Sequence, residues 1–186
     1  MKKNFLPIAL YLLVLVCCGT AEGEGLGEAG RQSLETEYTI IFYRDLNALQ
    51  KLNKKIKYGP GKRGFFSSPS KHELIFMVSR KTDLLFERVQ EILDMRRKTK
   101  KVTVQCYADR TELDNEFFRM YRKKNHVRAW YWFKNNTIYL NLDDLHEGML
   151  AHEMAHAIID QFLLVRPPPT TAEILARYVD SHLFKK

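Results

Sequence analysis

The pattern H-E-x-x-H at residues 152–156 constrains this 186-residue chain more than any other feature. Two histidines four residues apart on an α-helix lie on one face, one turn apart, so their ring nitrogens can converge on one metal ion. The glutamate beside the first histidine can act as a general base toward water at that metal. Apolar segments, GMLA before the motif and AII after it, indicate a helix in the core. We therefore expect a buried helix with His152 and His156 as metal ligands and Glu153 as the base.

The third ligand decides which class of zinc site is present, because a catalytic zinc usually takes three protein ligands and keeps a fourth position open. The metzincin extension requires Gly and His at positions held here by Ile159 and Phe162, so that class is excluded. The alternative takes a glutamate from a following helix, and Glu173 is the one Glu downstream of the motif. Zinc suits a His/His/Glu set with one open position, so we expect one Zn²⁺ per chain.

The connection between the two segments has the composition of a turn between helices. Prolines 167–169 end the first helix and let the chain turn back, and Thr170 or Thr171 can cap the next helix. Ala172 and Ala176 flank Glu173 and allow the two helices to pack closely.

Residues 150–157 (LAHEMAHA), the prolines and residues 172–179 (AEILARYV) together resemble the peptidase MA-like gluzincins, a bacterial family of zinc metallopeptidases with the pattern H-E-x-x-H…E. The resemblance implies a single zincin-like α+β domain. In it, a small mixed sheet with an edge hairpin packs on the H-E-x-x-H helix and on a following helix that bears the glutamate.

Two positions depart from the family pattern. Ile174 replaces the usual Gly, and Arg177 stands where the thermolysin pattern has an Asp. A carboxylate that orients a zinc-binding imidazole must therefore come from elsewhere, and Asp180 and Asp160 are the candidates. For both residues the favoured alternative is a solvated helix carboxylate.

A hairpin is predicted directly before the metal-binding helix. Residues 127–133 and 137–142 read as strands around the turn Lys134-Asn135-Asn136. The resemblance places the first strand at the sheet edge above the metal, where an extended peptide binds by strand addition. That strand contains Ala129, Trp130, Tyr131, Trp132 and Phe133. Trp130 and Trp132 should face one side and Tyr131 and Phe133 the other; a half-buried aromatic strand without a substrate role is the alternative.

A donor for the oxyanion of the tetrahedral intermediate is also required. Tyr178 is the nearest phenol downstream of Glu173, and Tyr131 and His146 are weaker candidates. The residues alone leave this role unassigned.

Residues 1–21 have the pattern of an export signal, with Lys2 and Lys3 before an apolar run too short to span a bilayer comfortably. Residues 15–18 (LVCC) resemble a bacterial lipobox with Cys18 as the acylated residue, so a membrane tether through Cys18 and free secretion both stay open. We expect a periplasmic or extracellular protein, with residues 22–33 as a flexible tether.

Residues 34–186 suffice for one domain. We expect strands at 38–43 and 102–107, and helices at 45–56, 70–95 and 112–123, the second opened by a capping box at residues 70–73. Cys106, the only Cys of this region, is predicted to be a buried structural thiol. Its isolation excludes an intramolecular disulfide there.

The net charge of +8 comes in part from basic groups at residues 96–98, 100–101 and 122–124. Such groups are compatible with nucleic-acid binding. However, they fall at predicted helix ends and loops of an exported protein, so we expect a solvated or envelope-facing surface and no nucleic-acid partner.

These features predict an exported zinc metallopeptidase that acts on a peptide or protein substrate. The alternative is a non-catalytic zinc-binding envelope module, because only thirteen residues follow Glu173 to build a far wall of a substrate cleft. A basic binding domain with an accidental motif is the third interpretation.

Overall fold

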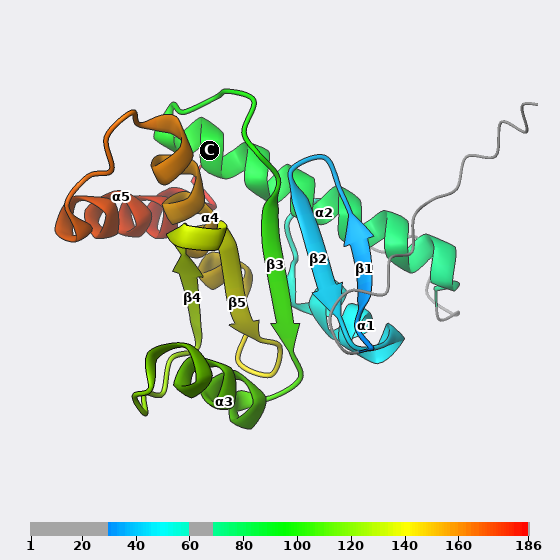
Figure 1. Cartoon of the computed structure of the whole chain (residues 1–186). Helices are drawn as coiled ribbons and strands as arrows, with labels where there is room; N and C mark the ends of the chain where they lie inside the picture. Colours follow the sequence, from blue (N-terminus) through cyan, green and yellow to red (C-terminus); the bar gives the residue numbers. More distant parts are fainter. Residues whose placement is uncertain (1–29, 60–68, 186) are drawn as a thin grey trace, which may run out of the picture.

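The computed structural model describes residues 30–59 and 69–185, which form a five-stranded mixed sheet and five α-helices (Figure 1). This architecture is compatible with the predicted α+β class. The expected export signal, Cys18 and residues 22–29 of the expected tether lie outside the described residues. None of the described helices is both long and apolar enough to cross a membrane.

The sheet has the strand order β1-β2-β3-β5-β4. The central pairs β2/β3 and β3/β5 are parallel, whereas β1/β2 and β4/β5 are antiparallel, so both edges of the sheet are strands of antiparallel pairs. The strands are β1 (Gln32–Glu35), β2 (Thr39–Tyr43), β3 (Val102–Tyr107), β4 (Ala129–Trp132) and β5 (Thr137–Asn141). The predicted hairpin is therefore present as β4/β5, and β4 is an edge strand.

Four helices pack with one face of the sheet around the main apolar core (Figure 1). They are α1 (Leu46–Lys55), α2 (Lys71–Leu93), α4 (Glu147–Phe162) and α5 (Pro169–His182). The remaining helix, α3 (Arg110–Tyr121), packs through Leu113 against Tyr107, Trp130 and Tyr139 in a separate cluster. The predicted alternation of side chains along β4 is confirmed for residues 130–132. Trp130 and Trp132 belong to this separate cluster, while Tyr131 packs on the main core.

Three predicted helices begin at side-chain caps. The carboxylates of Asp45 and Asp109 accept the backbone N–H three residues on, and Ser70 with Glu73 forms the full capping box that the sequence predicted. These bonds satisfy N–H groups that have no partner inside the helix, so each helix starts within two residues of its predicted position.

The amino-terminal boundary was predicted incorrectly. Gln32 and Ser33, assigned to the tether, lie in β1, and the strand at Thr39–Tyr43 is thus the second one. β1 escaped detection because only Leu34 of its four residues is buried, as is usual for a short edge strand. Arg31 fixes its start by donating to the Gln105 side chain at 2.8 Å.

The start of α5 also differs from the prediction. Pro168 is the N-cap residue and Pro169 the first helical residue, so neither Thr170 nor Thr171 caps the helix. Proline is favourable at this position because its missing N–H would have no helical acceptor and its φ is already helical.

Cys106 is buried, as predicted, and is the only free cysteine among the described residues. Burial raises the pKa of its thiol to about 12. The residue is therefore an unreactive thiol of the core.

Candidate metal centre

Three side chains on two helices converge at one point. The Nε2 atoms of His152 and His156 lie 3.2 Å apart, and Oε2 of Glu173 lies 3.5 Å from the first and 3.6 Å from the second. The histidines occupy successive turns of α4, while Glu173 comes from the second turn of α5. Among the described residues these three form the one group of His, Cys, Asp and Glu side chains that could hold a metal ion.

The triangle has the size that tetrahedral coordination requires. Ligand atoms about 2.1 Å from a metal at tetrahedral angles are separated from each other by about 3.4 Å. The three observed separations, 3.2, 3.5 and 3.6 Å, scatter around this value. The donor set of two imidazoles and one carboxylate also suits zinc, so the predicted ligands fit the metal in both chemistry and spacing.

Close packing of α4 on α5 creates this convergence. Ala155 and Ala157 of α4 and Ala176 of α5 are fully buried in the main core. Small side chains let the helix axes approach, as the alanines beside Glu173 suggested. The histidines remain partly accessible, at 18% and 21% of their side-chain surface.

Two charged residues of α5 orient the triad. Oδ2 of Asp180 lies 3.1 Å from Nδ1 of His152, the ring nitrogen that faces away from the triangle. Nε of Arg177 donates to Oε1 of Glu173 at 2.8 Å, which leaves Oε2 toward the histidines. Of the two candidate carboxylates, Asp180 is therefore the one that contacts His152, and Arg177 holds the Glu173 side chain with Oε2 toward the histidines.

The electrostatics favour metal-binding protonation states. Burial, followed by the neighbouring His152, lowers the pKa of His156 and keeps its imidazole neutral. The bond from Arg177 is the main cause that lowers the pKa of Glu173, so this carboxylate is ionised. A neutral imidazole and an ionised carboxylate are the forms that coordinate a metal.

Glu153 lies beside the triad in a buried position, 8% exposed. Burial raises the pKa of its carboxyl to about 7, although His152 and a hydrogen bond from the Tyr131 backbone N–H act in the opposite direction. A carboxyl with a pKa near neutral pH can both accept and return a proton. Its position next to His152 is the one predicted for the base.

The edge strand presents backbone groups to this glutamate. The Asn141 N–H donates to the Arg128 carbonyl, and in the β4/β5 register these two residues are partners. Since bonded and non-bonded pairs alternate in an antiparallel ladder, Ala129 and Tyr131 direct their N–H and C=O groups away from β5. The bond from the Tyr131 N–H to Glu153 agrees with this assignment, so the open edge of β4 borders the triad.

The other predicted site residues lie elsewhere. The Tyr178 ring stacks on His182 at 3.9 Å, and His146 caps α4 through Nδ1, which accepts the Met149 N–H. Asp160 pairs with Arg166 at 2.8 Å and accepts a bond from the Tyr131 hydroxyl at 3.4 Å. Each of these groups has its contacts outside the triad, and no oxyanion donor is assigned among them.

Phe133 also differs from its predicted role. It begins a 3-10 turn that extends to Asn135, so the strand ends at Trp132. The turn places Asn136 in the left-handed conformation, which Asn tolerates better than most residues.

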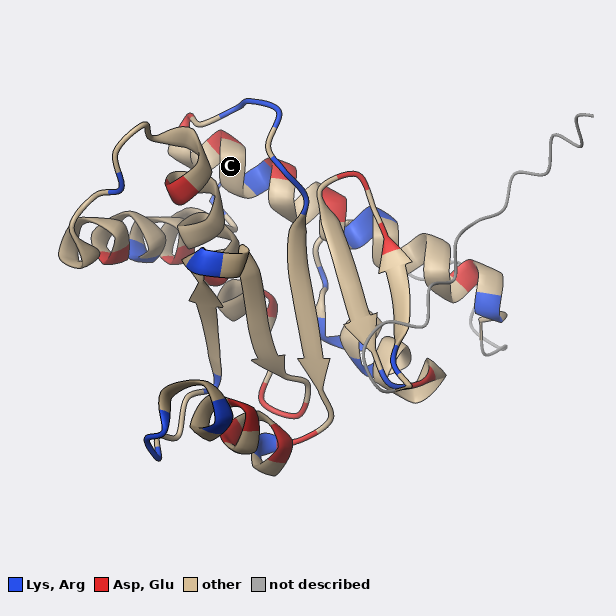
Figure 2. Ribbon diagram, in the orientation of Figure 1, with Lys and Arg blue, Asp and Glu red and all other residues tan. Residues whose placement is uncertain are grey.

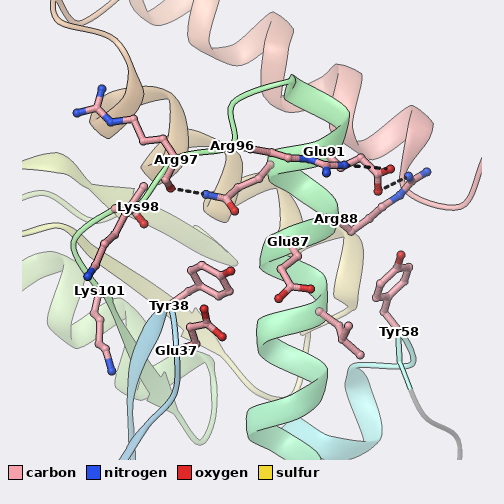
Figure 3. Close-up of a pocket in the computed structure, with 13 residues that line it drawn as sticks. Glu37, Tyr38, Tyr58, Glu87, Arg88, Glu91, Arg96, Arg97, Lys98 and Lys101 are labelled. Atoms are coloured by element: carbon pink, nitrogen blue, oxygen red, sulfur yellow. Dashed lines mark hydrogen bonds and ion pairs between the residues drawn. The ribbon is translucent and has the colours of Figure 1, made fainter.

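The three converging side chains lie near the surface, since the Glu173 side chain is 40% exposed. A cavity of about 850 Å³ exists in the protein, but it lies between α2, the β1–β2 turn and the loop after α2, and no triad residue lines it (Figure 3). Two tyrosines and a mixture of Glu, Lys and Arg side chains surround that cavity. The triad, and not this cavity, has converging ligand atoms that could hold a metal ion.

Comparison with models of protein families, with curated proteins and with solved structures found no match to this chain.

Proposed function

We propose that the protein is a zinc-dependent metallopeptidase of the gluzincin type, with His152, His156 and Glu173 as ligands of one zinc ion. The observation that carries this proposal is the triangle of Nε2, Nε2 and Oε2 atoms, whose sides match the edges of a tetrahedral zinc site. A zincin-like arrangement of the domain, with α4 below an edge strand and α5 supplying the third ligand, is part of the same proposal.

When bound, zinc supplies Lewis acidity toward a carbonyl oxygen and acidifies water. Glu153 provides the base in this scheme. Its carboxylate takes the proton of the attacking water and returns it to the leaving amine, and a pKa near 7 serves both transfers. Asp180 and Arg177 hold His152 and Glu173 in place.

The substrate we propose is an extended peptide paired with the free edge of β4. The outward N–H and C=O of Ala129 and the outward C=O of Tyr131 offer hydrogen bonds that do not depend on the peptide's sequence. A peptide held there lies next to Glu153, because the Tyr131 N–H already contacts that carboxylate.

The decisive test combines metal content with peptide cleavage in Glu153→Gln. This substitution leaves the three ligands intact, so one zinc per chain and abolished cleavage, beside an active parent, support the proposal. A parent that binds no zinc refutes it.

A zinc-binding module without turnover is the second candidate, and the shallow setting of the triad favours it, since the Glu173 side chain is 40% exposed. Such a module predicts one zinc per chain and no cleavage of any peptide library by either parent or variant. The same pair of proteins therefore separates the two candidates.

A further inference from the structure

Three loops that meet at one end of the sheet carry Lys and Arg residues but no Asp or Glu. They are residues 95–101 between α2 and β3, residues 133–136 between β4 and β5, and residues 163–168 between α4 and α5 (Figure 1). Together they contain seven Lys and Arg residues, and Figure 2 shows their blue segments at one end of the molecule, next to red segments of α2 and of the β1–β2 turn. Asp94, the C-cap residue of α2, directly precedes the first loop. We call these three loops the basic rim; its charged residues are Arg96, Arg97, Lys98, Lys100, Lys101, Lys134 and Arg166.

Hydrogen bonds join the three loops into one surface. The Asn136 side chain donates to the Lys101 carbonyl at 3.0 Å and accepts from Gln161 at 3.2 Å. The Gln161 side chain in turn accepts the Lys100 N–H at 2.7 Å. Arg97 completes the contact with the end of α4 by donating to the Phe162 carbonyl at 3.1 Å. The basic rim is thus a connected surface.

Large apolar side chains protrude from the same surface. Leu164 is 99% exposed and Val165 is 81% exposed, and Phe133 is partly exposed beneath the Arg166 guanidinium, 3.6 Å from its ring centre. Two adjacent aliphatic side chains so fully exposed contribute nothing to the core. An exposed pair of adjacent aliphatic side chains is typical of a surface that contacts a membrane or another apolar partner.

Part of the positive charge of the basic rim is not neutralised by the protein. Lys101 pairs with Glu35, Arg96 with Glu91 and Arg166 with Asp160. Within the described part of the chain, Arg97, Lys98, Lys100 and Lys134 form no ion pair. Figure 3 shows the side chains of Arg97 and Lys98 pointing away from α2, while Arg96 and Arg88 gather around Glu91. Glu37, in the turn between β1 and β2, is a further acid at this end.

We propose that the basic rim docks on the surface of an anionic phospholipid bilayer. The unpaired Lys and Arg side chains would meet lipid phosphates while Leu164 and Val165 enter the interface between headgroups and acyl chains. A nucleic acid would satisfy the charges equally well but offers no apolar phase to the Leu-Val pair. The inference does not depend on the metal centre or on any acylation of Cys18.

The test measures partition of the full-length chain onto vesicles of phosphatidylcholine with 30% phosphatidylglycerol and onto phosphatidylcholine alone. Residues 1–29 are common to every variant, so differences report on the described surface. Each Lys near an anionic membrane contributes about fivefold, so Lys98→Gln/Lys100→Gln should weaken binding to the anionic vesicles by about 25-fold. The matched control Lys123→Gln/Lys124→Gln, at the end of α3, should bind as the parent does.

The apolar contribution is tested separately. Leu164→Ser/Val165→Ser, which removes no core packing, should weaken vesicle binding at least about tenfold. The emission of Leu164→Trp should shift to the blue on anionic vesicles. An equal loss of vesicle binding in the Lys123/Lys124 control would overturn the proposal, and so would the absence of a blue shift. The proposal would also be overturned if the protein bound a DNA duplex as tightly as the vesicles and the Leu164/Val165 change did not affect that binding.

Discussion

Glu153 has a measurable energetic signature even without metal. Its carboxyl pKa is 4.5 ordinarily and about 7 in the folded protein, chiefly because the group is buried. Between these pH values the folded protein holds a proton that the unfolded chain has released, so the free energy of unfolding falls as the pH rises. At about 1.4 kcal/mol per pH unit, the ionised carboxylate destabilises the metal-free domain by about 3 kcal/mol above pH 7.

Glu153→Gln should therefore stabilise the metal-free domain, which few substitutions of a buried residue do. The amide keeps the shape of the side chain and an oxygen that can accept the Tyr131 N–H, but it carries no charge. We expect a gain in the free energy of unfolding of about 3 kcal/mol at pH 8 that declines to less than about 1 kcal/mol at pH 5. Urea unfolding in EDTA, followed by tryptophan fluorescence at both pH values, measures the difference.

Glu147 supplies the matched control on the same helix. It is also buried, but Oε2 accepts the backbone N–H groups of Lys57 at 2.9 Å and Tyr58 at 2.7 Å. Glu147→Gln weakens these charge-assisted bonds and should destabilise the domain by about 1 kcal/mol. A Glu153→Gln protein no more stable than the parent at pH 8 would refute the reasoning, since burial would then carry no penalty for the charge.

Three further predictions concern the ligands and the edge strand. Zinc at 100 times its Kd should stabilise the parent by about 2.7 kcal/mol in thermal unfolding, and Glu173→Ala should abolish that effect. Arg177→Met and Asp180→Asn should each weaken zinc affinity by about 10-fold or more in a chelator competition. The control Arg119→Met, on α3, should leave the affinity unchanged. Unchanged zinc affinity in Arg177→Met and Asp180→Asn would mean that these contacts do not orient the ligands. Ala129→Pro removes an outward N–H of β4 and should raise KM for peptides at least about tenfold with zinc binding retained, and an unaltered KM would exclude strand addition.

The sequence predicted the triad because its determinants are local. The spacing of His152 and His156 fixes their common helix face, and Glu173 was the one glutamate in the following segment. The β4/β5 hairpin was likewise predicted, from two short strand patterns on either side of Asn135-Asn136. In these cases neighbours in sequence decide the geometry.

The supporting contacts could not be predicted, because they depend on how helices cross. Asp160 and Asp180 were equivalent as candidates until the packing of α5 on α4 placed Asp180 at His152, while Arg166 occupies Asp160. In the sequence, Arg177 indicated only that the Asp of the thermolysin pattern is missing, yet in the structure its side chain donates to Glu173. Glu147 bonds a segment about 90 residues away, a distance over which sequence periodicity carries no information.

The placement of the whole centre in residues 152–180 has a consequence for the order of folding. Sixteen residues separate His156 from Glu173, so closing this loop costs about 0.6 kcal/mol less in chain entropy than pairing β3 to β5 across more than thirty residues. The α4–α5 pair can therefore form before the sheet. The zinc ion proposed for the triad, if present during refolding, should then accelerate folding as well as slow unfolding. The ion would then act first as a folding nucleus and only afterwards as a cofactor.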